Sequence, residues 1–338
     1  MMRKANQASA EVTARKATLT EIYSLWLDYR HTWQWQNPFV TPPWLKSWWN
    51  NFAGDNEPLL IVISADGSPV GIAPLMMKKG ATRFMGSIDL CDTGDFIVAP
   101  GGEDLFFNGL LSFLESEGIH RLALEPVRPD SHVCLAFVPI ARANKWHVSL
   151  VSQGASLEMD LPASWEEYLQ TLDRKQRHEV RRKLRRLGEA GVLGQCSVKK
   201  VSETDSAMDM FVQLFRQSRK DKKAFMTSQR ESFFRNLAAE LAHEKMLNLL
   251  CLTIDNTPAA AVFCIENGKT FHLYNNGFNP RFRGNSIGVV SKLLTIRSSI
   301  ESGLLVYDFL NGTERYKYRL GGKEVPLSTC IIEHTKWR

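Results

Sequence analysis

The sequence predicts an α/β (α+β) protein built from two lobes, each with a mixed, mostly antiparallel sheet flanked by helices. Two dipeptides, Asp66-Gly67 and Asp255-Asn256, each separate a pair of apolar runs, which is typical of β-hairpins. In both halves a helix precedes the hairpin, and a strand, a loop, an amphipathic helix and a further strand follow it. The shared order indicates a duplicated architecture, although no residue-level repeat accompanies it.

The first lobe is expected over residues 19–155, after a polar tail over residues 1–18 that we expect to be disordered. A helix is predicted after Thr41, because proline is tolerated in the first helical turn, where the amide has no partner. The further elements expected in this lobe are hairpin strands over 58–79, a strand over 82–90, a helix over 105–118 and a strand over 120–127.

The second lobe is expected over residues 156–338. Ser164 and Glu167 have capping-box spacing, and the helix that they begin is expected to continue straight into the basic run 174–186. Apolar side chains form one stripe of that helix and arginines another. The elements expected after it are hairpin strands over 248–268, a strand over 269–278, a helix over 286–303 and a strand over 304–310.

The positive charge of the chain is local. Of the net charge of +6, the run 174–186 contributes eight Lys/Arg and one Glu, so the remaining 34 basic and 35 acidic residues give −1. A local anionic partner is therefore favoured over general affinity for nucleic acid, and no DNA partner is expected. The six cysteines have no metal-ligand or disulfide-framework spacing, so we expect reduced thiols and no metal. No apolar run is long enough to span a membrane.

Residues 281–288, RFRGNSIG, join a predicted strand to a predicted helix and have the composition of an anion-binding loop. Amides at a helix N-terminus point outward, and the helix dipole adds a partial positive charge there. Glycine lets a ligand approach the backbone closely. The residues expected to hold phosphate are Arg281, Arg283, Gly284, Asn285, Ser286, Ile287 and Gly288. For the motif alone, a plain helix-opening turn is the alternative.

A second conspicuous run, YDFLNGTERYKYRLGG, follows the helix predicted after this loop. With the R-x-x-G pattern before a helix, it resembles the GNAT acyltransferase superfamily. The resemblance is closer to the CelD-like branch, which is linked to cellulose and exopolysaccharide biosynthesis. The residues that match its D-F-x-x-G and Y-K-x-x patterns are Asp308, Phe309, Gly312, Tyr316 and Lys317. FMGSIDLCDTGDF and RRKLRRLGEAG are also similar to this family, so the resemblance runs from about Leu19 to Ile332.

The resemblance implies two tandem GNAT-like lobes, of which the first is degenerate, and acetyl-CoA or another acyl-CoA as co-substrate. Arg281, Gly284 and Ser286 match the family's R/Q-x-x-G-x-G/A pyrophosphate loop, except that Ser286 departs from its last position and narrows the approach to the backbone. In the first lobe, the corresponding loop contains Asp92 and Asp95, whose charges repel phosphate, so CoA is not expected there.

The implied reaction needs a group that accepts a proton from the attacking amine and amides that stabilise the oxyanion. Asp308 is the expected general base, because it lies near the end of the strand after the loop helix; a turn or cap role is its alternative, and Glu314 is the fallback base. Tyr316 and Lys317 are the other expected catalytic residues, as proton donors or ligands of the acyl oxygen. Their alternative is an amphipathic tyrosine and a solvated lysine on a strand.

Acceptor binding is expected on two other segments. His272 and Tyr274 alternate along the strand before the loop and face one side of the sheet, where GNAT-like sites bind the acceptor; a structural role is the alternative. Arg177 and Arg181 on the cationic helix have three interpretations. They belong to a solvated face, they bind a nucleotide diphosphate or an anionic sugar, or they belong to a tRNA-binding surface, against which the lack of stacking aromatics counts.

The leading hypothesis is a cytoplasmic enzyme, peripheral at the inner face of the membrane, that transfers acetyl to an amine or hydroxyl of a sugar-linked or cell-envelope precursor. One alternative comes from a more distant resemblance to the Fem transferases, which move an amino acid from aminoacyl-tRNA to a cell-wall precursor. Another is a catalytically inactive GNAT scaffold of a polysaccharide synthase. The expected partners are a small-molecule or sugar-linked acceptor, the synthase machinery and, for the Fem alternative, tRNA.

Overall fold

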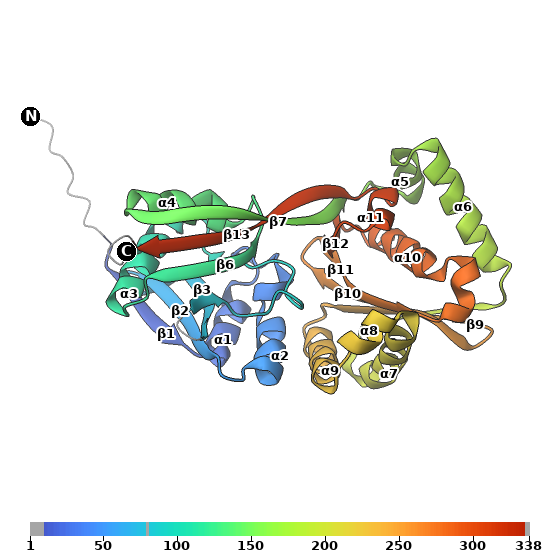
Figure 1. Ribbon diagram of the computed structural model, residues 1–338, viewed down its shortest axis with the longest axis horizontal. Helices are drawn as coiled ribbons and strands as arrows, with labels where there is room; N and C mark the ends of the chain where they lie inside the picture. Colours follow the sequence, from blue (N-terminus) through green and yellow to red (C-terminus); the bar gives the residue numbers. More distant parts are fainter. Residues whose placement is uncertain (1–9, 79–80, 335–338) are drawn as a thin grey trace, which may run out of the picture. The chain divides into compact units, whose positions relative to one another are not determined.

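The computed structural model describes residues 10–78 and 81–334, and the chain divides into two compact units (Figure 1). Unit 1 comprises Met1–Pro42, Gly54–Gln153 and Ser328–Arg338, and unit 2 comprises Pro43–Ala53 and Gly154–Leu327. The strands form a large, mostly antiparallel sheet flanked by helices, so the predicted α/β fold class is confirmed. The predicted tail before residue 10 and the predicted strand end at Lys79 lie outside the described residues.

The strands of unit 1 follow the order β1-β2-β3-β4-β6-β13-β7, and β5 pairs with β3. Among them β4 and β6 are parallel, with Thr82 opposite Leu122. Phe106 and Phe107 of α3 pack against Phe96 in the buried core of this unit. The elements are β1 (Val12–Ala17), α1 (Leu19–Tyr29), η1 (Pro38–Val40), β2 (Glu57–Ala65), β3 (Ser68–Lys78), β4 (Ala81–Phe84), β5 (Ile97–Val98), α3 (Glu103–Ser116), β6 (Arg121–Val127), η2 (Val133–Phe137), α4 (Val138–Ala143), β7 (Trp146–Asp160) and β13 (Lys323–His334).

The first strand corrects one expectation from the sequence. Val12–Ala17 was predicted within a disordered tail, but it pairs antiparallel with β2, with Val12 opposite Ala65. The side chains of this edge strand are mostly exposed, so its sequence carries no apolar alternation. Backbone hydrogen bonds to the hairpin hold β1 in place, and these bonds do not require particular residue types.

The strands of unit 2 follow the order β7-β12-β11-β10-β9-β8, in which β11 and β12 are the parallel pair. Helix α10 packs on one face of β10 and β11, and α7 packs on the other (Figure 1). The elements are α2 (Pro42–Phe52), α5 (Trp165–Thr171), α6 (Arg174–Gly188), β8 (Leu193–Val198), α7 (Val201–Ser218), α8 (Lys220–Phe225), α9 (Ser228–His243), β9 (Leu247–Ile254), β10 (Thr257–Asn267), β11 (Thr270–Phe278), η3 (Pro280–Asn285), α10 (Ile287–Glu301), β12 (Val306–Asn311) and α11 (Arg315–Arg319).

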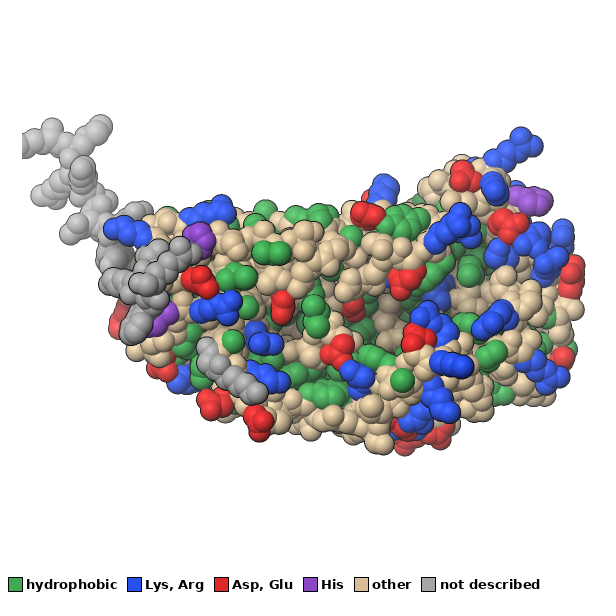
Figure 2. Space-filling model, in the orientation of Figure 1, with side chains coloured by type: hydrophobic (Ala, Val, Ile, Leu, Met, Phe, Trp, Pro, Cys, Tyr) green, Lys and Arg blue, Asp and Glu red, His purple; other side chains and the backbone are tan. Residues whose placement is uncertain are grey.

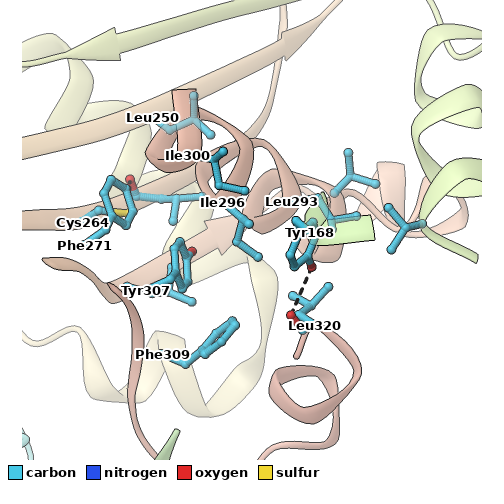
Figure 3. Packing of buried hydrophobic residues seen from close by; sticks show 14 of the residues in the cluster. Tyr168, Leu250, Cys264, Phe271, Leu293, Ile296, Ile300, Tyr307, Phe309 and Leu320 are labelled. Atoms are coloured by element: carbon cyan, nitrogen blue, oxygen red, sulfur yellow. Dashed lines mark hydrogen bonds between the residues drawn. The ribbon is translucent and has the colours of Figure 1, made fainter. Parts of the chain in front are cut away.

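The main core of unit 2 fills the space between α10 and the sheet (Figure 3). Leu293 and Ile296 of α10 face Phe271 and Tyr307 of the parallel strands. Tyr168 of α5 enters the same cluster, and its hydroxyl donates a hydrogen bond to the Leu320 carbonyl at 3.1 Å. The start of α10 is thereby fixed relative to the two parallel strands.

Both predicted hairpins are confirmed. Asp66 and Gly67 have φ of 48° and 79°, and Asp255 and Asn256 have φ of 48° and 59°. Two successive left-handed residues are the geometry of the type I′ turn, which matches the twist of the strands it joins. The hairpins are β2–β3 and β9–β10.

Helix α2 belongs to unit 2, although its position in the sequence lies within the expected first lobe. Trp44 packs edge-on against Phe233 of α9, with ring centroids 6.2 Å apart, and Phe52 contacts the same ring. Lys46 Nζ lies 2.6 Å from Glu240 Oε1. The partner of Trp44 is almost 200 residues away in the chain, so a local sequence pattern does not reveal it.

The single helix expected from Ser164 through the basic run is wrong, because the chain breaks between α5 and α6. Leu172 is extended, with φ −77° and ψ 146°. Asp173 then caps α6, since its Oδ1 accepts a hydrogen bond from the Gln176 amide at 2.7 Å. A capping aspartate satisfies amides that a continuous helix would bond to its own carbonyls, so it favours a new start at this point.

Candidate active site

The loop predicted to hold phosphate is η3, followed directly by α10. Its entry is anchored by Asn279, whose Oδ1 accepts from the Arg281 amide at 3.0 Å and whose Nδ2 donates to Pro258 O at 3.1 Å. The Asn279 amide also donates to Ala259 O at 2.8 Å. Arg281 and Arg283 are exposed. The loop is thus tied to the start of β10 while its arginines stay accessible.

Ser286 is the residue that departs from the family pattern, and its backbone adopts a conformation that favours glycine. Its φ of 57° and ψ of 32° lie in the left-handed region, and it directly precedes α10. A non-glycine residue pays about 1–2 kcal/mol for this conformation. The Ser286 amide donates to Arg283 O at 2.9 Å, which closes the turn. The backbone shape of a glycine-type loop is therefore retained with a serine.

The two glycines of the loop serve different purposes. A Cβ placed on Gly284 would meet no atom within 4 Å, so this glycine faces open space. A Cβ placed on Gly288 would lie 3.1 Å from Phe278 Cδ1, so this glycine lets α10 pack closely on the end of β11. The amides of Ile287 and Gly288 lie in the first turn of α10, where helical carbonyl partners do not exist. The start of α10 thus offers amide donors beside an open backbone.

The two parallel strands pair only over a short distance, which ends at a buried acid and a buried histidine. The register joins Thr270–His272 to Val306–Asp308. His272 Nδ1 lies 3.4 Å from Asp308 Oδ2, close enough for charge interaction but without hydrogen-bond geometry. In the described part of the chain, neither ring nitrogen of His272 has a hydrogen-bond partner. A buried imidazole with neither nitrogen hydrogen-bonded is uncommon in folded proteins.

Asp308 also shapes the backbone at the end of the pairing. Its Oδ1 accepts a hydrogen bond from the Leu310 amide at 2.7 Å. The register of β12 with β7 shifts between Asp308 and Leu310, and Leu310 has φ of 59°. Asp308 therefore supports a β-bulge with one oxygen and approaches His272 with the other. Bulges of this kind are common next to active sites.

Tyr274 follows His272 by two residues on β11, at a point where the register with β10 shifts. Its ring lies 5.7 Å from that of Phe234 and 5.9 Å from that of Phe263, and its side chain is buried. These partners make Tyr274 part of an aromatic core beneath α7 and α9. The packing of Tyr274 therefore favours the structural alternative for this residue.

Tyr316 and Lys317 lie on the short helix α11, whereas the sequence offered a strand for them. The Lys317 side chain is buried, and its ammonium donates to the carbonyls of Leu310, Asn311 and Gly312 at 3.0, 2.6 and 3.0 Å. Glu314 Oε2 lies 3.1 Å from the same nitrogen. An ammonium has three donors, so the backbone after β12 engages all of them.

Two buried lysines escaped the sequence analysis. Lys292 on α10 is 4% exposed, and its Nζ donates to Gly288 O at 2.6 Å and lies 4.8 Å from the centre of the Tyr316 ring. Burial, reinforced by the nearby charge of Lys222, lowers the pKa of Lys292 to about 7. Burial also lowers the pKa of Lys222 to about 8 and raises that of Tyr316. Helix α10 is covered on most sides, with only Arg297 and Glu301 exposed, so Lys292 has no exposed face to occupy.

Arg177 and Arg181 are not brought together as ligands of one anion. The Arg177 guanidinium bonds three carbonyls around the end of α5, at Leu169 (2.7 Å), Gln170 (3.2 Å) and Leu172 (3.1 Å). Arg181 is exposed and lies 3.6 Å from Glu166. Arg177 therefore acts as a cap that joins α5 to α6, while Arg181 belongs to the outer face.

The corresponding loop of unit 1 has a different construction. Asp95 accepts hydrogen bonds from the amides of His132 and Val133, at 3.0 and 3.2 Å. Burial opposes the charge of His132, but its contact with Asp95 still raises the pKa of the imidazole. The acid predicted to repel phosphate thus caps the chain segment that begins η2.

Comparisons with known proteins agree with this geometry. Residues 174–318 match the model of an acetyltransferase (GNAT) domain. No match was found among curated protein sequences. The structure is similar to a crystal structure of FemX, with a TM-score of 0.66 and 12% identity over 94% of this chain and 96% of that one.

Two further solved structures share the fold. The C-terminal domain (DUF2156) of a putative lysylphosphatidylglycerol synthetase from Agrobacterium fabrum has a TM-score of 0.58 and 12% identity, over 93% of this chain and 92% of that one. A tandem GNAT protein from the clavulanic acid biosynthesis pathway has a TM-score of 0.50 and 14% identity, over 95% and 98%. At such identities these likenesses concern the fold.

The domain match and the fold together make the chain an enzyme of the transferase class, of the acyltransferase type, with a GNAT-type acetyltransferase domain in unit 2. A GNAT domain implies an acyl-CoA co-substrate in general. Within residues 10–78 and 81–334, no helix is long and apolar enough to cross a membrane. The same residues hold no group of three or more His, Cys, Asp or Glu side chains arranged for a metal ion.

Proposed function

We propose that the chain transfers an acetyl group from acetyl-CoA to an amine or hydroxyl of a sugar-linked or cell-envelope precursor, as in exopolysaccharide or cellulose biosynthesis. The observation that carries the proposal is the loop from Arg281 to Gly288. It joins a strand of the parallel pair to a helix, keeps a left-handed turn at Ser286 and exposes the backbone at Gly284. The match of residues 174–318 to an acetyltransferase domain supports the same assignment.

In this proposal the loop binds the pyrophosphate of the donor. Arg281 and Arg283 supply charge, and the amides of Ile287 and Gly288 supply directed donors at the positive end of α10. The thioester then lies between β11 and β12, past the point where their pairing ends at His272 and Asp308. Strand separation exposes backbone groups there that can bond the acyl arm and the oxyanion.

The proposed chemical step is direct attack of the acceptor on the thioester carbonyl carbon. The new C–N or C–O bond forms, the C–S bond breaks, and the thiolate of CoA leaves. Asp308, paired with His272, accepts the acceptor's proton, and Tyr316 protonates the thiolate. Lys317 contributes by holding the backbone after β12 in place. The CelD-like resemblance of YDFLNGTERYKYRLGG supports the sugar-linked acceptor and a site of action at the inner face of the membrane.

Isothermal titration of acetyl-CoA into the full chain tests the donor. We expect saturable binding that weakens about tenfold in Arg283→Ala, because a charge-assisted phosphate contact is lost. Asp308→Asn is expected to keep donor binding and to lower kcat at least 100-fold. If millimolar acetyl-CoA gives neither heat nor a thermal shift with the wild-type protein, the CoA proposal is wrong.

A second candidate is a Fem-type transfer from aminoacyl-tRNA. Its support is the fold likeness to FemX over nearly the whole chain and the cationic outer face of α6. The exposed cations of that face are Arg174, Lys175, Arg181, Arg185 and Arg186. Filter binding of charged tRNA across a salt series tests it, since several phosphate contacts make affinity fall steeply with salt. Absent or salt-independent binding excludes this candidate.

A polysaccharide-synthase scaffold without catalysis is distinguished by cell-based variants. It predicts that Asp308→Asn leaves polysaccharide output unchanged, whereas charge reversal at Arg181 and Arg185 abolishes it. Loss of output with Asp308→Asn alone contradicts the scaffold and favours the enzyme.

A further inference from the structure

A second cationic feature of unit 2 lies beside the loop, and apart from Arg283 its residues have no role in the proposed reaction. A pocket of about 560 Å³ is lined by the end of α7, by α8 and by η3. Its cationic lining residues are Arg216, Arg219, Lys220, Lys223 and Arg283, against the acid Asp221. Figure 2 shows Lys and Arg side chains gathered over this part of unit 2. The pocket volume is of the size that accommodates a small-molecule group.

Not all of this charge is neutralised within the protein. Arg216 pairs with Glu231 at 2.9 Å, and Arg219 pairs with Asp221, with Nε and Oδ1 2.9 Å apart. For Lys220, Lys223 and Arg283, the described part of the structure contains no ion-pair partner. These three exposed cations leave the pocket with an excess positive charge, which attracts a compact anion.

The walls of the pocket are fixed relative to the loop. Lys222 points inward from α8, donates to the Asn276 carbonyl of β11 and lies 4.7 Å from the centre of the Phe215 ring. Gly277 of β11 packs so closely on α7 that a Cβ there would lie 2.3 Å from the Phe215 amide nitrogen. Helices α7 and α8 are thus held against the strand that leads into η3, so the cations are positioned before any ligand arrives.

Arg283 belongs to both the pocket and the phosphate loop. A donor whose pyrophosphate lies at the start of α10 has its remaining phosphates within reach of the pocket through this shared residue. We propose that the pocket of Lys220, Lys223 and Arg283 binds a phosphate group of the donor other than those held at the start of α10. The inference rests on the proposed function, because it assumes a phosphorylated acyl donor.

Two donors offer this chemistry. Coenzyme A carries a 3′-phosphate monoester remote from its pyrophosphate, and an aminoacyl-tRNA carries phosphodiesters along its acceptor end. Lysine and arginine bind either through charge-assisted hydrogen bonds. The proposed site is defined by its cationic side chains, which suit a phosphate from either donor. The experiment therefore has one arm for CoA and one for RNA.

The test uses the full chain, the double variant Lys220→Ala/Lys223→Ala and a control with equal loss of charge, Lys200→Ala/Lys269→Ala. Lys200 lies at the opposite end of α7, about 27 Å away for 18 residues at 1.5 Å each. Lys269 precedes β11, and the nine residues of that strand span about 30 Å before η3. Both control lysines are exposed.

In the first arm, CoA and 3′-dephospho-CoA are titrated calorimetrically. The wild-type protein and the control are expected to bind CoA about tenfold more tightly than 3′-dephospho-CoA, and the double variant is expected to lose this preference. In the second arm, an acceptor-stem RNA ending in CCA is measured by filter binding across a salt series. Loss of two phosphate contacts makes the negative slope of log K against log salt less steep by about 1.8.

Either change, absent from the control, supports the pocket and identifies the source of the phosphate. Wild-type binding of CoA or RNA that the double variant leaves unchanged overturns the pocket and leaves the proposed function intact. A wild-type protein that binds neither ligand overturns the phosphorylated donor, and the pocket with it.

Discussion

Replacement of Lys292 by methionine is expected to stabilise the protein at neutral pH. The lysine Nζ is buried between α10 and α11, with Gly288 O at 2.6 Å and the Tyr316 ring at 4.8 Å. Lys222 and Lys317 add nearby positive charge, which Glu314 and Cys264 offset in part. Methionine has nearly the same length and no charge, so it fills the space without the cost of burying an ammonium.

The magnitude follows from the pKa. An unfolded chain keeps the ordinary lysine pKa of 10.5, whereas the folded protein holds it at about 7. At about 1.4 kcal/mol for each pKa unit, the buried ammonium costs up to about 5 kcal/mol. Between pH 7 and 10.5 the unfolded state binds more protons than the folded state, so the lysine's contribution to the free energy of unfolding rises with pH. Below pH 7 both states are protonated and the full cost applies.

The Lys292→Met variant lacks this titration and also lacks the hydrogen bond to Gly288 O, worth about 1 kcal/mol. We therefore expect the variant to be more stable by roughly 3–4 kcal/mol at pH 6–7 and no more stable than the wild type near pH 10.5. Urea unfolding followed by tryptophan fluorescence at several pH values measures the difference, with the exposed Lys269→Met as control.

Two results would refute the reasoning about Lys292. One is a variant less stable than the wild type at pH 7, which would mean that the ammonium is well solvated or well paired. The other is a stability difference independent of pH, which would mean that the lysine keeps its ordinary pKa. Removal of Lys292 also relieves repulsion on Lys222, so Lys222→Met is measured alone and in combination to separate the two lysines.

Four further substitutions have definite expectations. Ser286→Gly relieves the left-handed strain and is expected to raise stability by about 1 kcal/mol; a lower melting temperature would contradict this. Arg177→Ala removes a cap from three carbonyls and is expected to destabilise by about 2 kcal/mol without weakening CoA binding, whereas Arg181→Ala leaves the melting temperature unchanged. Lys317→Met leaves buried carbonyls unpaired and is expected to lose about 3 kcal/mol or more in urea unfolding; a change confined to kcat would instead assign Lys317 to the reaction.

Much of the fold was predictable because it is encoded locally. The turns at Asp66-Gly67 and Asp255-Asn256 need left-handed residues, and these residue types supply them at little cost. Helices such as α3 and α10 end in glycine signals, at Gly118 and Gly303, both with positive φ. These features depend on a few neighbouring residues, which a sequence displays directly.

The misplaced elements depend on distant contacts. Strand β1 is held by pairing with β2, about 50 residues later, and α2 packs on α9, almost 200 residues later. The break before α6 was written in the sequence, since Asp173 is a good cap, but the continuous spacing of leucines across Leu172 favoured one helix. The spacing of apolar residues indicates which side chains lie on one face of a helix. It does not indicate whether one helix continues or two helices follow each other.

The candidate site divides in the same way. The loop from Arg281 to Gly288 was predictable as a short motif between two elements. The hydrogen bonds from Arg177 and Lys317 to backbone carbonyls were not predictable. A sequence does not show whether a cationic side chain is bound by solvent, by a ligand or by a buried carbonyl. His272 and Asp308 were singled out separately, and only the parallel register of β11 and β12 places them 3.4 Å apart.

Ser286 shows how a departure from a motif is best interpreted through conformation. The family pattern allows glycine or alanine at this position, whereas the backbone here has a left-handed φ of 57°, which glycine adopts at the least cost. A serine in that position bears strain but leaves the amides of Ile287 and Gly288 directed outward. The serine therefore lowers the stability of the loop more than it lowers the capacity of the loop amides to donate hydrogen bonds. If Ser286→Gly raises both the melting temperature and the affinity for CoA, strain in the loop limits phosphate binding; if only the melting temperature rises, the serine side chain does not obstruct the ligand.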